Sequence, residues 1–253
     1  MASGIPTTTV VRRRTNEQLA AALGGQSVLL ATVSAVAHLG VVGWLAGIAY
    51  ACGLCGVLGS AARRAGLSTL GPAGLVTLGR AVLVGGVTAL VADGLWNGDT
   101  SVAILVVIAA VALLLDAIDG RVARRSGTAS AFGARFDMEV DAFLLLVLSA
   151  YVAVLVGPWV LAIGAMRYAF VVASYAIPWM RSTVPARYSA KAVAAAQGIV
   201  LTLATSDVLP RPLAVVLIST ALVALVWSFG GDVAWLWSRN SGRKAQREIA
   251  AAA

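Results

Sequence analysis

Cysteine and histidine are nearly absent from this chain of 253 residues, which contains two cysteines and one histidine. Cys52 and Cys55 form a C-x-x-C pair inside an apolar run, without the additional cysteines or histidines that a zinc site requires. We therefore interpret both as small packing residues of the core. For His38 we expect a buried or interfacial structural role. Chemistry that needs two histidines is excluded.

Charged residues are also scarce. They make up 12% of the chain, whereas 60% of its residues are hydrophobic and the mean hydropathy is +0.89. Soluble domains contain about 25% charged and about 45–50% apolar residues. The apolar runs are long enough to cross a bilayer as helices of about 20 residues, and they lack the alternation of a membrane β-barrel. We expect an all-α, polytopic membrane helical bundle.

The apolar runs predict eight spans. The first run, Ser27–Ser60, is too long for one helix, and a break near Leu39–Gly43 would make it an N-terminal helical hairpin. The basic, polar segment before it is predicted to be a disordered arm. The six further spans that we expect are Leu75–Asp93, Val102–Arg121, Asp137–Val156, Pro158–Trp179, Ser189–Ser206 and Pro212–Trp237.

The basic residues predict the orientation in the membrane. Sixteen of the nineteen Lys and Arg residues fall in segments that eight spans would place on one side, which the positive-inside rule identifies as the cytoplasm. Both termini then face the cytoplasm. The net charge of +8 suits a neighbouring surface of anionic lipid. No basic patch interleaved with aromatic residues indicates nucleic acid.

The acidic residues are unevenly distributed, because five of the eleven lie between Asp116 and Asp141. Asp116 and Asp119 are three residues apart at the end of one expected helix, and Asp137 and Asp141 are four apart in the next. These spacings place each pair on one helix face. If the two helices pack together, four carboxylates converge at the cytoplasmic edge of the membrane.

Four carboxylates this close would repel one another unless a cation neutralised them. A ligand set of oxygen atoms alone favours Mg²⁺, with Mn²⁺ as an alternative. Arg124 offers a planar fork for phosphate oxygens, and Gly120 allows a ligand close to the backbone. The cluster therefore predicts a metal-diphosphate site beside lipid. The alternative is that the acids only form ion pairs with nearby arginines, which are Arg121, Arg124, Arg125 and Arg135.

The same run resembles the signature of the CDP-alcohol phosphotransferase (CDP-alcohol phosphatidyltransferase) family, D-x2-D-G-x2-A-R-x8-G-x3-D-x3-D, at all eight fixed positions. The resemblance covers about Leu75 to Trp237 and implies a six-helix membrane enzyme core, often homodimeric, with a cytoplasmic active site. The domains that we expect are a basic cytoplasmic tail (1–26), an apolar hairpin (27–66), a catalytic membrane domain (67–238) and a basic cytoplasmic C-terminal tail (239–253).

The resemblance also implies roles for the motif residues. Asp116, Asp119 and Asp137 would hold one or two Mg²⁺ ions on the diphosphate, and Asp141 would approach the metal and act as the general base. Gly120 and Arg124 would contact the CDP moiety, and Gly133 would be small either for close packing or to give the nucleotide access. The implied reaction is attack by an alcohol on the lipid-bearing phosphorus of a donor such as CDP-diacylglycerol, with release of CMP.

Two residues before the motif resemble the end of a second family segment, P-N-x-x-T-x-x-R. Thr77 and Arg80 match it, whereas Ala73 and Gly74 replace its Pro and Asn. Thr77 is a candidate for nucleotide binding. For Arg80 the sequence leaves two roles open, one functional and one in which the side chain snorkels to the interface.

Three further basic residues are candidates for binding a small polar acceptor, and they slightly favour a phosphorylated one. Arg167 lies inside an apolar span, where arginine is costly and usually faces the protein interior; its alternative role is an ion pair with a motif carboxylate. Arg187 and Lys191 lie in and after the following loop, where topology alone could explain them.

Two other functional classes stay open at this point. A transport protein would more often spread polar residues over several spans or contain internal repeats, and we find no repeat. A Mg²⁺-dependent membrane prenyltransferase would carry two Asp-rich motifs in separate loops, without the Gly120 and Arg124 pattern. We favour the phosphatidyltransferase, located in the plasma (inner) membrane of a bacterium.

Overall fold

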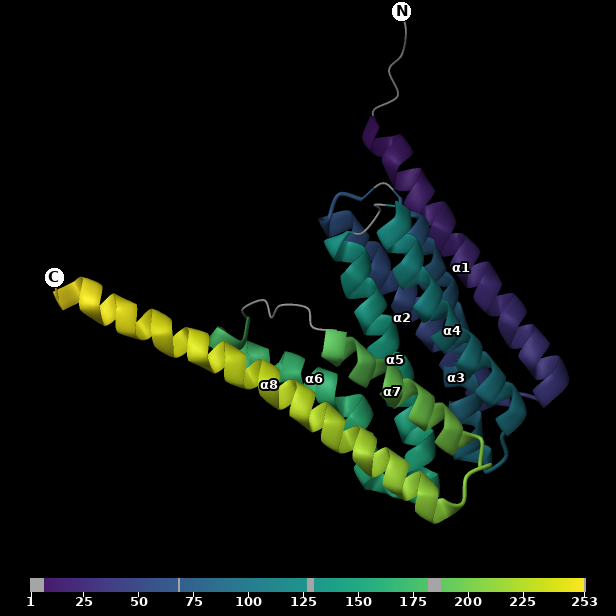
Figure 1. Cartoon of the computed structure of the whole chain (residues 1–253). Helices are drawn as coiled ribbons and strands as arrows, with labels where there is room; N and C mark the ends of the chain where they lie inside the picture. Colours follow the sequence, from purple (N-terminus) through teal and green to yellow (C-terminus); the bar gives the residue numbers. More distant parts are fainter. Residues whose placement is uncertain (1–6, 68, 127–129, 182–187, 253) are drawn as a thin grey trace, which may run out of the picture.

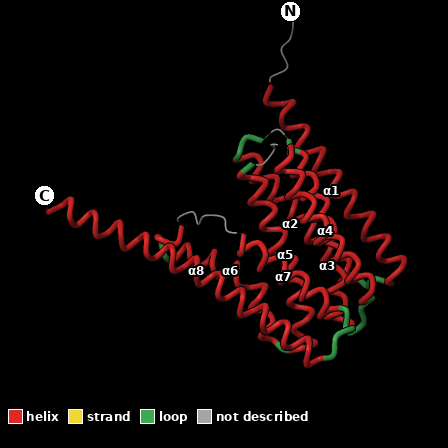
Figure 2. The backbone as a smooth tube through the Cα atoms, in the orientation of Figure 1, coloured by secondary structure: helices red, strands yellow, loops and turns green. Residues whose placement is uncertain are grey.

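The computed structural model describes the backbone of residues 7–67, 69–126, 130–181 and 188–252, and the side chains of 15–67, 69–118, 130–180 and 189–241. This described part contains eight α-helices and no strand, which confirms the predicted helical membrane bundle (Figures 1 and 2). The helices are α1 (Thr7–Ala37), α2 (Val41–Arg64), α3 (Pro72–Asn97), α4 (Val102–Ser126), α5 (Ala131–Val156), α6 (Leu161–Ala176), α7 (Tyr188–Thr205) and α8 (Arg211–Ala252).

Six of the helices are long and apolar enough to cross a membrane, namely α1, α2, α3, α5, α8 and the unit formed by α6 with the short 3₁₀ turn before it. The apolar parts of α4 and α7 that the structure describes, Val102–Ile118 and Ser189–Thr205, are shorter. The predicted hairpin break is also present. Helix α1 ends at Ala37, His38 adopts a left-handed φ of 51°, and α2 begins at Val41.

Helix α3 lies at the centre of the bundle. It packs against α1, α2, α4 and α5, and more of its length is buried than in any other candidate span of the described chain. Small residues allow the closest approaches: a Cβ atom on Gly43 of α2 would lie 3.0 Å from the carbonyl oxygen of Ala89 in α3. In Figure 1, α1 to α5 run side by side, while α8 lies across their end beside α6 and extends away from them.

The predicted disorder of the N-terminal arm is wrong for the residues that the structure describes. Helix α1 already begins at Thr7, and Leu19 is buried. The Gln18 side chain accepts a hydrogen bond from the Leu70 amide at 2.9 Å and donates one to the Leu70 carbonyl at 3.4 Å. These contacts tie the polar start of α1 to the segment before α3. The expectation for Cys52 also needs correction, because its side chain is exposed. His38 is exposed in the turn between α1 and α2, so of its two expected positions the buried one is wrong.

Asp93, near the end of α3, fixes the hairpin to the core. Its buried carboxylate accepts hydrogen bonds from the amides of Gly40 (3.0 Å) and Gly43 (3.3 Å), and from the Asn97 side chain at 3.0 Å. The N-cap residue of α2, Gly40, has no side chain that could cap the helix. Asp93 therefore supplies the cap from another helix, and its negative charge also suits the positive end of the α2 dipole.

We expect Asp93→Ala to lower the free energy of unfolding by about 2 kcal/mol, the upper end of the usual cost of a lost N-cap, because the amides are left without a partner in a buried place. Thermal unfolding in detergent measures this loss. Asp99→Ala is the matched control, since Asp99 is exposed in the loop that follows α3. Equal stability of the two variants would contradict the capping role.

Candidate active site

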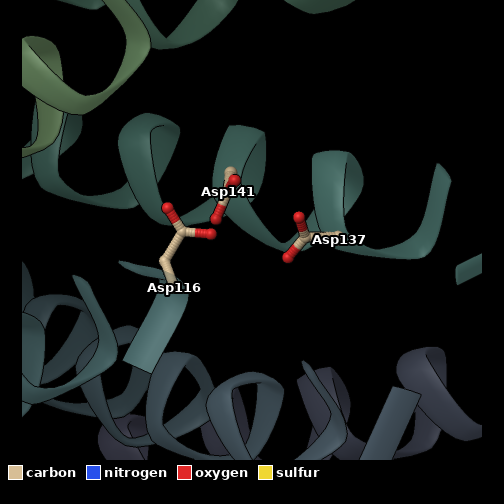
Figure 3. Close-up of side chains that lie close together, drawn as sticks. All are labelled: Asp116, Asp137 and Asp141. Atoms are coloured by element: carbon tan, nitrogen blue, oxygen red, sulfur yellow. The ribbon is translucent and has the colours of Figure 1, made fainter. Parts of the chain in front are cut away.

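Three of the four motif aspartates converge in the structure. Asp116 lies on α4, and Asp137 and Asp141 lie one turn apart on α5. One carboxylate oxygen from each lies within 4.8 Å of the others, and Figure 3 shows the three side chains directed toward one another. Helices α4 and α5 each pack extensively on α3, which brings the two acidic faces together.

The start of α5 is set locally. Ser130 is the N-cap residue, and its hydroxyl accepts a hydrogen bond from the Gly133 amide at 3.0 Å. A Cβ atom at position 133 would lie 3.1 Å from the Ser130 hydroxyl, so a larger residue would crowd this cap. The cap fixes where α5 begins. It therefore helps to set where Asp137 and Asp141 lie along α5 relative to Asp116 of α4.

Arg80 of α3 occupies the centre of the acidic cluster. Its side chain is 1% exposed, although its guanidinium is charged. The Nη1 atom lies 3.0 Å from Asp116 Oδ1 and also pairs with Asp137, while Nη2 pairs with Asp141. The Nε atom donates to the Ala112 carbonyl at 3.1 Å. The guanidinium therefore joins three helices, α3, α4 and α5. Of the two roles left open for Arg80, snorkelling is wrong, because the group is buried.

The described cluster has an excess of negative charge. Three carboxylates and one guanidinium leave a formal charge of −2. The carboxylates are each about a third exposed, so their outer oxygen atoms remain accessible. Clustered oxygen ligands with this charge, and with no described nitrogen or sulfur ligand in the group, match the preferences of a hard divalent cation. The donor set therefore fits a metal such as Mg²⁺.

Several predicted site residues lie outside the described side chains. Asp119, Gly120 and Arg124 belong to the helical backbone of α4, and Arg187 lies in the segment 182–187. Their proposed roles stay predictions. The alternative of ion pairs with neighbouring arginines is tested only at Arg135, which forms no such pair with a described residue. All three acids pair with Arg80.

The remaining candidates are Thr77, Arg167 and Lys191, which differ in burial and in their partners. Thr77, one turn before Arg80, is buried and donates to the Ala73 carbonyl of its own helix at 3.1 Å. Arg167 forms an ion pair with Glu139, which lies between Asp137 and Asp141 but outside the cluster. Lys191 is exposed near the start of α7.

Sequence reasoning missed the central place of Arg80 and the pairing of Glu139. A signal for Arg80 was present, because an arginine inside an apolar helix needs a partner in the protein interior. No such signal marked Glu139. It lies two residues from Asp137 and from Asp141, so it points to a different face of α5.

The fold and the cluster together define a multi-pass helical membrane protein with a carboxylate site between packed helices. A comparison with protein families matches residues 72–229 to the CDP-alcohol phosphatidyltransferase family, so the chain belongs to this family. The matched segment begins with α3, ends inside α8 and includes all four motif aspartates, whereas α1 and α2 precede it. Searches of curated proteins and of solved structures give no significant match.

Proposed function

We propose that the protein transfers a phosphatidyl group from CDP-diacylglycerol to the hydroxyl of a small polar alcohol, releasing CMP, as a step of phospholipid biosynthesis. The observation that supports this most is the convergence of Asp116, Asp137 and Asp141 within 4.8 Å, inside the segment that matches the family. Neither a prenyltransferase nor a transport protein has a comparable observation in its favour.

The four motif aspartates, Asp116, Asp119, Asp137 and Asp141, would hold Mg²⁺, and Mn²⁺ would suit the same oxygen ligands. When bound, the metal neutralises charge on the diphosphate and on the departing phosphate. Arg80 holds the carboxylates in place from the interior side. Gly120, Arg124, Thr77 and Gly133 are the residues that we propose for the nucleotide side of the site.

The transfer needs one proton acceptor. The acceptor hydroxyl attacks the phosphorus that carries the lipid, a new P–O bond forms, and the P–O bond to CMP breaks. Asp141 takes the hydroxyl proton, because an ionised carboxylate within hydrogen-bond reach is a competent general base. Its position on α5, one turn after Asp137, keeps it beside the metal ligands while leaving an oxygen accessible.

The acceptor is proposed to be a phosphorylated alcohol. Arg167, Arg187 and Lys191 are the candidates for its phosphate, of which Lys191 is exposed and Arg167 already neutralises Glu139. The distribution of the basic segments supports a cytoplasmic location for this side of the molecule and for both termini, which we propose here. We further propose a homodimer in the plasma (inner) membrane of a bacterium, surrounded by anionic lipid.

The direct test uses the purified full chain with labelled CDP-diacylglycerol, Mg²⁺ and one alcohol at a time. The candidate alcohols are glycerol 3-phosphate, inositol phosphate, inositol and serine. We expect CMP release and a labelled lipid product with one of them, and loss of both when EDTA removes the divalent cation. Failure with every alcohol, beside an active control enzyme in the same assay, would overturn the proposed transfer.

A further inference from the structure

A groove between α2 and α5 lies on another face of α5 from the acidic cluster. It encloses about 850 Å³, which falls within the ~300–1,000 Å³ of typical ligand sites. One wall belongs to α2, outside the segment that matches the family, and the other to α5, with Tyr168 of α6 beside it. The lining is mostly apolar, and Val57 in the α2 wall is exposed. An apolar ligand therefore fits the interior of the groove.

The charged side chains of the groove gather near one end. Arg64 is the last residue of α2, and Arg135 lies in the second turn of α5. Both are exposed, and neither forms an ion pair within the described part of the chain. Glu139, the acidic residue of the lining, is neutralised by Arg167. This end therefore carries an unbalanced positive charge.

The length of the groove matches one leaflet of a bilayer. Arg64 and Tyr50 lie fourteen positions apart on α2, which corresponds to about 21 Å of helix, and one leaflet including its headgroup region is about 20–22 Å thick. At the far end the rings of Tyr50 and Phe143 meet, with centroids 5.2 Å apart. The groove thus extends from a basic opening at the membrane surface to an aromatic contact inside the membrane.

We propose that this groove binds one anionic glycerophospholipid, with its phosphate at Arg64 and Arg135 and an acyl chain between α2 and α5. Guanidinium groups bind phosphate oxygens through paired hydrogen bonds, and basic side chains near a membrane end attract anionic lipid. The N-terminal hairpin would then supply one wall of a lipid site. This lipid binding goes beyond the proposed transfer reaction and does not depend on that reaction.

Labelling with a photoreactive lipid tests the acyl-chain part. The probe is phosphatidic acid with a diazirine in one acyl chain, added to the full chain in phosphatidylcholine nanodiscs, and labelled peptides are identified by mass spectrometry. We expect labels on α2 and α5. Gly53→Leu should reduce them about tenfold, because a leucine there excludes two or more methylene groups of the chain. Position 53 lines the groove, and a Cβ atom there meets no atom within 4 Å.

Gly56→Leu is the matched control, since it makes the same change on the same helix, also into open space, but outside the groove lining. It should label like the wild type. Equal labelling of the two leucine variants would overturn the proposal. So would cross-links that join two copies of the chain through these helices, which would identify a second copy as the occupant.

Competition tests the headgroup part. Unlabelled phosphatidic acid should displace the probe from the wild type more strongly than phosphatidylcholine does, and this preference should disappear in the double variant Arg64→Gln/Arg135→Gln. Arg63→Gln, on an exposed arginine outside the lining, should keep the preference. Equal displacement of the probe from the wild type by both lipids would contradict an anionic ligand. The probe carries no CDP group, so an inactive transferase would leave every outcome readable.

Discussion

Replacing Asp141 by asparagine is expected to lower the rate of phosphatidyl transfer by about 10²–10⁴-fold, the usual contribution of a general base. Asparagine has nearly the same shape but cannot take a proton from the acceptor hydroxyl. The measurement is kcat for CMP release, with saturating CDP-diacylglycerol, alcohol and Mg²⁺. Saturating metal matters, because Asp141 also belongs to the group of carboxylates that would hold the ion.

Two comparisons separate proton transfer from metal binding. Asp116→Asn should mainly raise the Mg²⁺ concentration needed for half-maximal activity, because Asp116 is proposed only as a ligand. Asp99→Asn makes the same chemical change at an exposed loop position and should leave the rate unchanged. If Asp141→Asn reached the wild-type kcat once Mg²⁺ was saturating, Asp141 would be a ligand and not the base.

Much of the site was predictable because it depends on local geometry. The spacing of four between Asp137 and Asp141 forces them onto one face of any helix, and the structure places them there. The apolar runs predicted all eight α-helices of the described chain, and six of these are long and apolar enough to cross a bilayer, which requires about 20 residues for each span. A break near Leu39–Gly43 followed from the length of Ser27–Ser60, which no single span could accommodate, and the structure has this break between Ala37 and Val41.

Contacts between distant segments were not predictable in this way. Gln18 and Leu70 are 52 residues apart, so the polar composition of the N-terminal segment predicted disorder where the structure has a packed helix. Arg80 is separated from Asp137 and Asp141 by 57 and 61 residues. One sequence gives no information on which face of α3 meets α4 and α5, and the partner of Arg80 depends on that face.

Helix α3 connects the hairpin to the candidate active site. It carries two buried charges, Arg80 and Asp93, thirteen residues apart, which corresponds to about 20 Å along the helix. Arg80 holds the carboxylates of α4 and α5 at one end, while Asp93 caps α2 at the other. The hairpin precedes the segment that matches the family, yet it is anchored to the same helix that organises the acids.

Removing the guanidinium should make the fold depend on a divalent cation. In metal-free buffer, we expect Arg80→Ala to lose about 3 kcal/mol of stability, the lower end of the cost of breaking a buried ion pair, because the carboxylates are partly exposed. Mg²⁺ should restore much of this loss, since a ligand at 100 times its Kd stabilises a protein by about 2.7 kcal/mol. Thermal unfolding in detergent with EDTA or Mg²⁺ measures both effects, and calorimetric titration gives the Mg²⁺ affinity.

The same variant should bind Mg²⁺ at least as tightly as the wild type while turning over more slowly, because the carboxylates keep their charge but lose the group that positions them. Arg80→Lys should be intermediate in stability, as it retains the charge without the planar fork that reaches three acids. If Arg80→Ala does not fold, the same measurements can be made on Arg80→Lys. Arg63→Ala, at an exposed arginine, should unfold like the wild type in both buffers. If Arg80→Ala also unfolded like the wild type in EDTA, the guanidinium could not be the cation that holds the acidic cluster together.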